Sequence, residues 1–205
     1  MRVETLTETV TSRPSRRHWA HWASAVSVNV STRNLLDYDL PSIIRTLLDR
    51  FELPASVLQL EITESRIVAD LKRARVALDE VRGMGVKIAI DDFGTGFSSL
   101  SQLQQLPIDE IKIDKSFVTR METNRNDAVL VRSIIDLGRN LGLQVTAEGV
   151  ESENIRRSLT KLGCDFAQGF HIGRPTPAEE CRRHLQESEP PPPPVVLAAT
   201  RPGPR

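Results

Sequence analysis

The chain has 205 residues, of which 39% are hydrophobic, and its 27 basic and 27 acidic side chains give a formal net charge of zero. This composition is ordinary for a soluble globular protein, and the neutral balance gives no electrostatic reason to expect a nucleic-acid polymer or an anionic membrane as partner. No apolar run approaches the roughly 20 residues that a membrane helix requires. Cys164 and Cys181 lack metal-ligand spacing, so we interpret them as reduced thiols of a cytoplasmic protein.

The two ends of the chain differ from its middle. Residues 1–15 are rich in Thr, Ser and Arg without periodicity, and residues 188–205 begin with a run of prolines. A proline run adopts an extended, solvated conformation that has no core. We therefore predict that both ends are disordered and that residues 16–187 form one domain.

Within that domain, apolar runs of strand length alternate with helical patterns. Strands are expected at residues 26–30, 57–62, 86–90, 110–113, 143–147 and 165–168. Helices are expected at residues 16–23, 40–51, 69–82, 98–105, 127–141, 152–162 and 177–186. This alternation predicts an α/β fold with a mainly parallel sheet and right-handed crossovers. A closed barrel of this type has about eight such units, so the chain forms either an open sheet or a barrel that is incomplete at its N-terminus.

Polar side chains gather at the carboxyl ends of these predicted strands. They are Asn29, Glu61, Asp91, Asp92, Lys112, Asp114, Glu148 and Gln168. Taken singly, each is more often an exposed or turn residue, but their recurrence at the same end of successive strands indicates a shared site. Carboxylate and amide oxygens are ligands that suit Mg²⁺ or Mn²⁺.

A pair of such cations, roughly 3.5–4 Å apart, is the usual device for phosphodiester hydrolysis. A cation would also explain why Asp91 and Asp92 stand side by side despite their like charges. Lys112 would then act on the attacking water or the phosphate, and Glu148 would be a general base or a further ligand. The segment Phe93, Gly94, Thr95 and Gly96 is too short for a phosphate-cradling motif, so we interpret it as the hinge of a mobile loop.

A series of motifs in this order resembles one family. The motifs are Ser27-Val-Asn-Val-Ser31, Leu60-Glu-Ile-Thr-Glu-Ser65, Ile90-Asp-Asp-Phe-Gly-Thr-Gly-Phe-Ser-Ser-Leu100, Ile111-Lys-Ile-Asp-Lys-Ser-Phe-Val118, Ala147-Glu-Gly-Val-Glu151 and Gln168-Gly-Phe170 with Arg174-Pro175. Over about residues 16–187 the chain is similar to the EAL domain, a bacterial cyclic di-GMP phosphodiesterase family. The resemblance implies a modified TIM barrel and the hydrolysis of cyclic di-GMP to linear pGpG with Mg²⁺ or Mn²⁺.

The resemblance also implies a role for each matching residue. Asn29, Glu61 and Asp91 correspond to ligands of a first metal, and Asp91 and Asp92 to ligands of a second. Lys112 corresponds to the lysine that holds the catalytic water, Glu148 to an acidic residue near the second metal, and Gln168 to a supporting polar residue. Glu64 corresponds to the glutamate that steadies the loop of residues 92–99, which links homodimerisation to catalysis, and Asp114 to a further carboxylate of the site.

The sequence departs from the family pattern at its start. It contains no Glu-Ala-Leu motif, whose glutamate is a metal ligand in the family and is followed by an arginine that contacts the substrate. We therefore expect a weakened first metal site and a barrel without its opening segment. The alternative to a metal-dependent phosphodiesterase is a catalytically degenerate domain that binds cyclic di-GMP or docks onto another protein.

Overall fold

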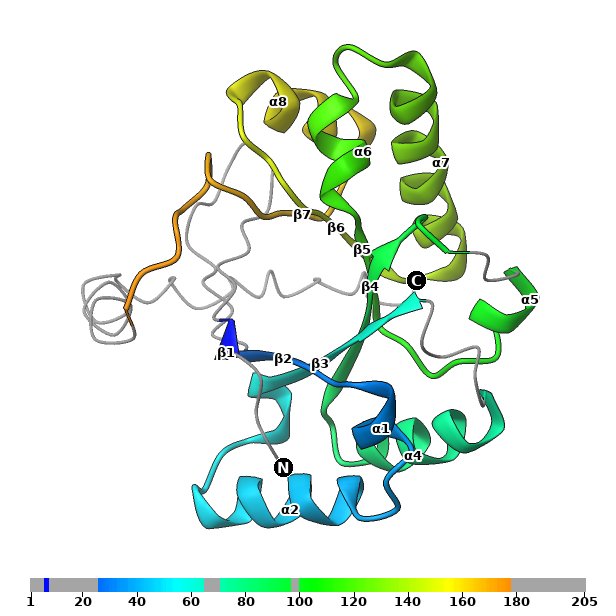
Figure 1. Ribbon diagram of the computed structural model, residues 1–205, viewed down its shortest axis with the longest axis vertical. Coiled ribbons are helices and arrows are strands. Elements are labelled where there is room, and N and C mark those ends of the chain that lie inside the picture. The colour runs from blue at the N-terminus through cyan, green and yellow to red at the C-terminus, as the bar shows by residue number, and fades with distance from the viewer. Residues whose placement is uncertain (1–5, 8–25, 65–70, 97–99, 178–205) are drawn as a thin grey trace, which may run out of the picture.

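The computed structural model describes residues 6–7, 26–64, 71–96 and 100–177. Six parallel strands follow one another in chain order across a single sheet, and a short strand pairs antiparallel with the first of them. The strands are β1 (Leu6–Thr7), β2 (Val26–Asn29), β3 (Leu58–Thr63), β4 (Lys87–Phe93), β5 (Glu110–Ile113), β6 (Gln144–Ala147) and β7 (Phe166–Ala167). The sheet curls into an arc, as in an incomplete barrel (Figure 1).

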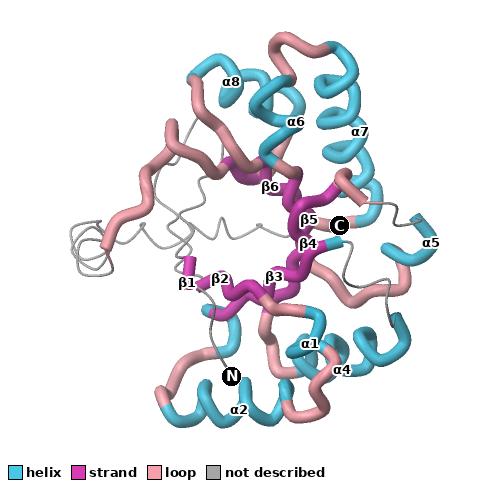
Figure 2. The backbone as a smooth tube through the Cα atoms, in the orientation of Figure 1, coloured by secondary structure: helices cyan, strands magenta, loops and turns pink. Residues whose placement is uncertain are grey.

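The helices cover the convex side of the sheet, as the tube in Figure 2 shows. They are α1 (Thr32–Leu35), α2 (Leu40–Arg50), the 3-10 helix η1 (Ala55–Val57), α4 (Leu71–Gly83), α5 (Leu100–Leu103), α6 (Lys115–Arg120), α7 (Arg125–Leu141) and α8 (Glu153–Leu162). Parallel strands with helices on one side confirm the predicted α/β architecture.

Among the described residues, no helix has the length and apolar character needed to cross a membrane.

Most predicted elements match the observed ones. Each of the six expected strands overlaps one of β2 to β7, and five expected helices overlap α2, α4, α5, α7 and α8. The expected helix at residues 16–23 and all but the first residue of the one at 177–186 lie outside the described residues. So do the predicted disordered ends, apart from residues 6–7, which form β1. Helix α6 was not predicted, although Asp114 caps it by accepting a hydrogen bond from the Ser116 N–H.

The strands place alternate side chains on opposite sides of the sheet. The residues on the convex face of the strands, such as Ile62, Ile90 and Ile113, are almost fully buried in the apolar core under the helices. The alternate residues of these strands point polar side chains to the concave side, where Gln59 and Lys112 are also buried. Because buried polar groups require partners, this polar interior can hold a functional site.

The long helix α7 ends where the sequence predicts but begins two residues earlier, at Arg125. The Asn124 side chain caps its N-terminus by accepting hydrogen bonds from the backbone N–H groups of Asn126 and Asp127. Gly142 ends it in the left-handed conformation, with φ of 71°. One face of the helix, including Val131 and Ile135, is buried against the sheet.

The close contact between α7 and β6 depends on a glycine. A Cβ atom at Gly138 would lie 2.2 Å from the Val145 Cγ2 atom. We expect Gly138→Ala to lower the free energy of unfolding by about 1–3 kcal/mol, because the added methyl group overpacks this contact. Chemical denaturation would measure the change. The control is Gly83→Ala at the end of α4, where no atom lies within 4 Å of the added carbon; an equal effect of both substitutions would contradict the prediction.

Candidate metal-dependent active site

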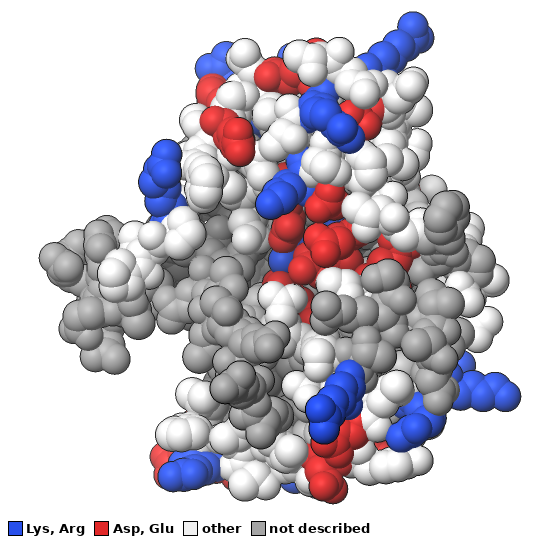
Figure 3. Space-filling model, in the orientation of Figure 1, with Lys and Arg blue, Asp and Glu red and all other residues white. Residues whose placement is uncertain are grey.

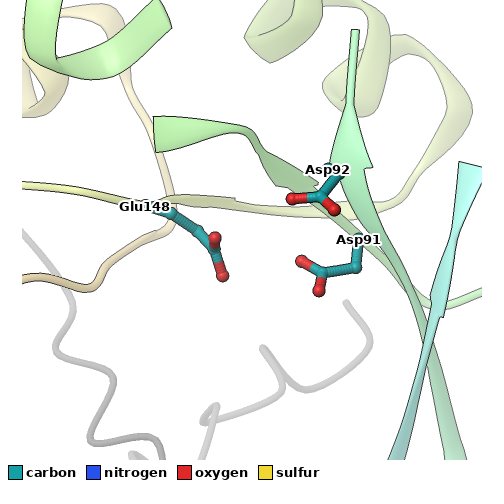
Figure 4. Close-up of side chains that lie close together, drawn as sticks. All are labelled: Asp91, Asp92 and Glu148. Atoms are coloured by element: carbon teal, nitrogen blue, oxygen red, sulfur yellow. The ribbon is translucent and has the colours of Figure 1, made fainter. Parts of the chain in front are cut away.

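The carboxyl ends of β4 and β6 bring three acidic side chains together. One carboxylate oxygen from each of Asp91, Asp92 and Glu148 lies within 4.8 Å of the others. Their carboxylates point toward a common space (Figure 4). Acidic side chains gather at the centre of the face in Figure 3, with basic side chains close by. Three like charges at this spacing repel one another unless a positive group compensates for them.

A bulge in β4 explains how two consecutive residues reach the same space. Between the pairs Ile90–Ile111 and Phe93–Ile113, β4 contains one residue more than β5. Asp92 takes a positive φ of 54°, which is rare for a residue other than glycine. A regular strand would send adjacent side chains to opposite faces, and the bulge re-aims Asp92 toward Asp91.

Lys112 supplies positive charge directly beside the acidic cluster. Its Nζ atom lies 2.6 Å from Glu148 Oε1, 2.8 Å from Glu61 Oε1 and 3.5 Å from Asp91 Oδ1. Only 3% of the Lys112 side chain is exposed. The ammonium therefore joins carboxylates from the ends of three different strands or the turns that follow them.

The cluster shifts the titration of its members. Burial by itself would lower the pKa of Lys112, but the carboxylates of Glu148, Glu61 and Asp91 outweigh burial and raise it above its ordinary value. Burial raises the pKa of Glu148, although Lys112 opposes this shift. The pKa of Asp92 is raised by burial, then by the charges of Asp91 and Asp114.

These raised carboxyl pKa values predict how metal-free stability varies with pH. For Glu148 and Asp92, the stabilising contribution is fully present below the ordinary values of 4.5 and 3.8 and is lost as pH rises through the folded-state pKa. We expect Asp92→Asn to flatten the decline of the thermal unfolding midpoint between acid and neutral pH, measured in EDTA. The exposed Asp79→Asn should keep the wild-type slope, and an equal slope in all three proteins would contradict the assignment.

The donor set fits a hard divalent cation. Among the residues that the structure describes, Glu61 Oε1 and Asp91 Oδ1 are buried oxygens without a hydrogen-bond partner. The 2.8 Å contact of Glu61 with Lys112 is thus an ion pair whose geometry is not that of an aligned hydrogen bond. Buried acceptors of this kind require a positive partner, and all-oxygen donors match Mg²⁺ or Mn²⁺.

Three other predicted site residues lie at the same edge of the sheet. Asn29 ends β2 and stands opposite Glu61 in the strand register, with its side chain exposed. Asp114 follows β5 and caps α6, and its charge acts on Asp92. Gln168 follows β7, and its backbone bonds to both Ala147 and Val150. The structure thus places these residues at the carboxyl ends of β2, β5 and β7, outside the triad itself.

Glu64 holds the segment after the acidic pair. Its Oε2 atom accepts hydrogen bonds from the backbone N–H groups of Gly94, at 3.1 Å, and Gly96, at 3.0 Å. A Cβ atom at Gly96 would lie 2.9 Å from the Glu64 Cδ atom, so glycine is needed for this approach. The Thr95 hydroxyl donates a hydrogen bond to the backbone carbonyl of Asp92 at 2.8 Å. The segment of residues 93–96 is therefore tied directly to the end of β3.

Removing the Glu64 charge should loosen this segment. In Glu64→Gln, a neutral amide oxygen accepts weaker hydrogen bonds from the two N–H groups than the carboxylate does. Hydrogen bonds to charged groups contribute about 1.5–3 kcal/mol each. We expect hydrogen exchange at Gly94 and Gly96 to become about tenfold faster or more. The exposed Glu80→Gln on α4 is the matched control. Unchanged protection of both glycines in Glu64→Gln would show that the carboxylate does not restrain the segment.

Sequence reasoning missed a second polar layer below the cluster. The buried Glu110 accepts hydrogen bonds from Gln59, at 3.1 Å, and from Thr146, at 2.5 Å. A signal for this layer was present in the sequence, because Gln59, Glu110 and Thr146 each precede a predicted site residue by two positions. Period-two spacing places such pairs on the same face of a strand.

Comparison with known proteins identifies the family. The model of the EAL domain family matches residues 3–175. The bifunctional diguanylate cyclase/cyclic di-GMP phosphodiesterase MucR of Pseudomonas aeruginosa is 44% identical over 155 residues, which are 76% of this chain and 23% of that protein. The uncharacterized protein Rv1354c of Mycobacterium tuberculosis is 42% identical over 180 residues, or 84% of this chain and 29% of that protein. The chain thus spans less than a third of these curated relatives.

Solved structures agree with this assignment. The MucR phosphodiesterase in complex with c-di-GMP superposes with a TM-score of 0.74 at 44% identity, covering 77% of this chain and 64% of that one. The EAL domain of Mycobacterium smegmatis DcpA gives a TM-score of 0.76 at 40% identity, covering 82% of this chain and 75% of that one. Fold, motif order and sequence identity therefore lead to one conclusion: the chain belongs to the EAL domain family.

Proposed function

We propose that this domain hydrolyses cyclic di-GMP to linear pGpG with the help of divalent cations. The observation that carries the proposal is the convergence of Asp91, Asp92 and Glu148 within 4.8 Å beside the buried Lys112. Kinship with MucR, whose curated name includes cyclic di-GMP phosphodiesterase and whose solved structure is a c-di-GMP complex, supports the choice of substrate. The fold alone would not specify a reaction, because one barrel architecture hosts many chemistries.

Asp91, Asp92 and Glu148 are the residues that would hold a cation, with Glu61 and Asn29 completing the oxygen donors from β3 and β2. When bound, Mg²⁺ or Mn²⁺ would polarise the phosphodiester and lower the pKa of a water molecule. Mg²⁺ and Mn²⁺ both accept such ligands, and the proposal therefore covers either ion.

The chain's own residues supply positioning and charge. The Lys112 ammonium is fixed by contacts to Glu61 and Glu148, and it remains charged at neutral pH because these carboxylates raise its pKa. A fixed ammonium can orient an attacking water and stabilise negative charge that develops on phosphoryl oxygens. Glu148 lies close enough to accept a proton within the same space. Glu64 keeps residues 93–96 at the rim of the site.

Direct assay tests the proposal. Purified protein incubated with cyclic di-GMP and Mn²⁺ should produce pGpG, separated from substrate by chromatography, and EDTA should abolish the product. A cooperative thermal transition would first establish that the protein is folded. If folded protein yields no pGpG above the EDTA blank at any tested Mn²⁺ or Mg²⁺ concentration, hydrolysis is overturned.

A second candidate is nucleotide binding without hydrolysis. The observation in its favour is that Lys112 already compensates part of the carboxylate charge within the chain itself, through contacts of 2.6, 2.8 and 3.5 Å. Calorimetry with cyclic di-GMP in EDTA separates the two candidates. Saturable binding together with absence of turnover in Mn²⁺ would favour the binding module.

A further inference from the structure

Glu110 lies directly below the acidic cluster and has no part in the proposed chemistry. It precedes Lys112 by two residues on β5, so both side chains lie on the concave side of the sheet. Only 6% of Glu110 and 3% of Lys112 are exposed. A carboxylate so deeply buried is costly unless its oxygens are hydrogen-bonded and its charge is compensated.

Each oxygen of Glu110 has a partner on a different strand. Gln59 Nε2 on β3 donates to Oε2 at 3.1 Å, and Thr146 Oγ1 on β6 donates to Oε1 at 2.5 Å. On β4, which runs between β3 and β5, the residue opposite Glu110 is Ala89. The small alanine side chain leaves room for Gln59 to reach across. One carboxylate therefore ties together three strands of the concave side.

The same strands carry the cluster one layer above. Two residues beyond Gln59 and Glu110 stand Glu61 and Lys112, and two residues beyond Thr146 stands Glu148. The spacing of β3, β5 and β6 at the lower layer consequently sets the spacing of these three charged groups. Burial raises the pKa of Glu110, while Thr146, the Lys112 charge and Gln59 oppose this shift.

A cation at Asp91, Asp92 and Glu148 would repel the nearby ammonium of Lys112 and compete for its carboxylate partners. Glu148, Glu61 and Asp91 face Lys112 at 2.6, 2.8 and 3.5 Å. Glu110 lies one layer below on the same face of β5, where the Lys112 charge acts on it, and it is not among the proposed ligands. We propose, building on the proposed metal site, that Glu110 is a positioning residue. Its hydrogen bonds to Gln59 and Thr146 fix the spacing of β3, β5 and β6, and its charge offsets part of the Lys112 charge, so that the carboxylates above can hold the cation beside the ammonium.

The test is the isosteric variant Glu110→Gln in the full chain, with Mn²⁺ as the probe. The substitution removes the charge while preserving volume and one acceptor for the partners on β3 and β6. Stabilisation by Mn²⁺, followed as the thermal midpoint against Mn²⁺ concentration, should require about tenfold more Mn²⁺ than in the wild type. The metal-free midpoint should stay equal or rise, because a buried charge has been removed.

Asp127→Asn is the matched control, because Asp127 is also buried, at 7% exposure, but lies at the start of α7. It should leave the Mn²⁺ requirement unchanged. In the cyclic di-GMP assay, Glu110→Gln should lower kcat about tenfold with little change in KM, and Glu110→Asp should recover part of kcat. If Glu110 had a purely structural role, Glu110→Gln would change the metal-free midpoint but would keep the wild-type Mn²⁺ requirement, kcat and KM.

The outcomes separate the two proposals. Wild-type protein that responds to Mn²⁺, together with an identical response in Glu110→Gln, overturns the role of Glu110 and leaves the proposed function standing. Wild-type protein without any Mn²⁺ response overturns the metal site and the role of Glu110 together. A Glu110→Gln variant whose Mn²⁺ requirement rises only as far as that of Asp127→Asn also counts against the positioning role.

Discussion

Replacing Lys112 with Met should lower the free energy of unfolding of the metal-free protein by about 3–5 kcal/mol, the usual cost of breaking a buried ion pair from one side. The substitution leaves Glu61, Asp91 and Glu148 without the ammonium that now lies within 3.5 Å of each. Chemical denaturation in EDTA at neutral pH measures this loss. Lower pH should restore part of it, because protonation relieves the repulsion among the carboxylates.

Added Mn²⁺ should also restore stability in Lys112→Met, because a divalent cation can take over the compensation of charge. Activity should not return with stability, since the variant lacks the group that we propose to orient the attacking water. Lys87→Met on the neighbouring strand β4, where the lysine is exposed, is the matched control and should be close to neutral. A stability loss in Lys112→Met no larger than in this control would refute the compensating role of the ammonium.

Replacing Asp91 with Asn should reduce the rate of cyclic di-GMP hydrolysis by about 100-fold or more, equivalent to about 3 kcal/mol of transition-state stabilisation. Asp91 belongs to the acidic triad and also contacts Lys112, so its carboxylate serves both the proposed cation and the ammonium. The amide keeps the shape of the side chain but removes its charge. The stabilisation of the fold by Mn²⁺ should fall in parallel, which the thermal midpoint would report.

The control for Asp91→Asn is Asp79→Asn on the exposed surface of α4, where the carboxylate pairs with Arg75 at 3.5 Å. An exposed pair of this kind contributes little to stability, and neither of its residues belongs to the acidic cluster. Full activity in Asp91→Asn would remove Asp91 from the site. Lost activity with an unchanged Mn²⁺ response would instead assign Asp91 to substrate positioning.

Much of the fold could be predicted from the sequence because its local signals agree. The run Val86–Ile90 reads as a strand buried on both faces, and Ile88, Ala89 and Ile90 are indeed at most 1% exposed. Helix α4 follows from an apolar stripe in which Ala74, Leu78 and Val81 are buried. The short helices α1 and α6 were missed, since four to six residues carry too little periodicity to be recognised.

The residue types of the site could be predicted from the sequence, but the distances between their side chains could not. Strand order and parallel direction place Glu61, Asp91 and Glu148 at one edge of the sheet, as the alternating pattern predicts. The three-way contact of Lys112 and the buried bonds of Glu110 depend on which strands lie side by side and how far they curl. Such distances arise from packing across strands that are far apart in the chain.

The sequence by itself determined the order of strands and helices, the apolar face of each element and the types of side chain at the carboxyl ends of the strands, because these properties follow from local periodicity and residue chemistry. Only the tertiary structure decided that Asp91 and Asp92 share one space. Period-two alternation would separate them, and the bulge opposite β5, with Asp92 at a positive φ, brings them together. The physical reason is that a bulge is non-local. The extra residue in β4 is defined only by how β4 pairs with the neighbouring strand β5.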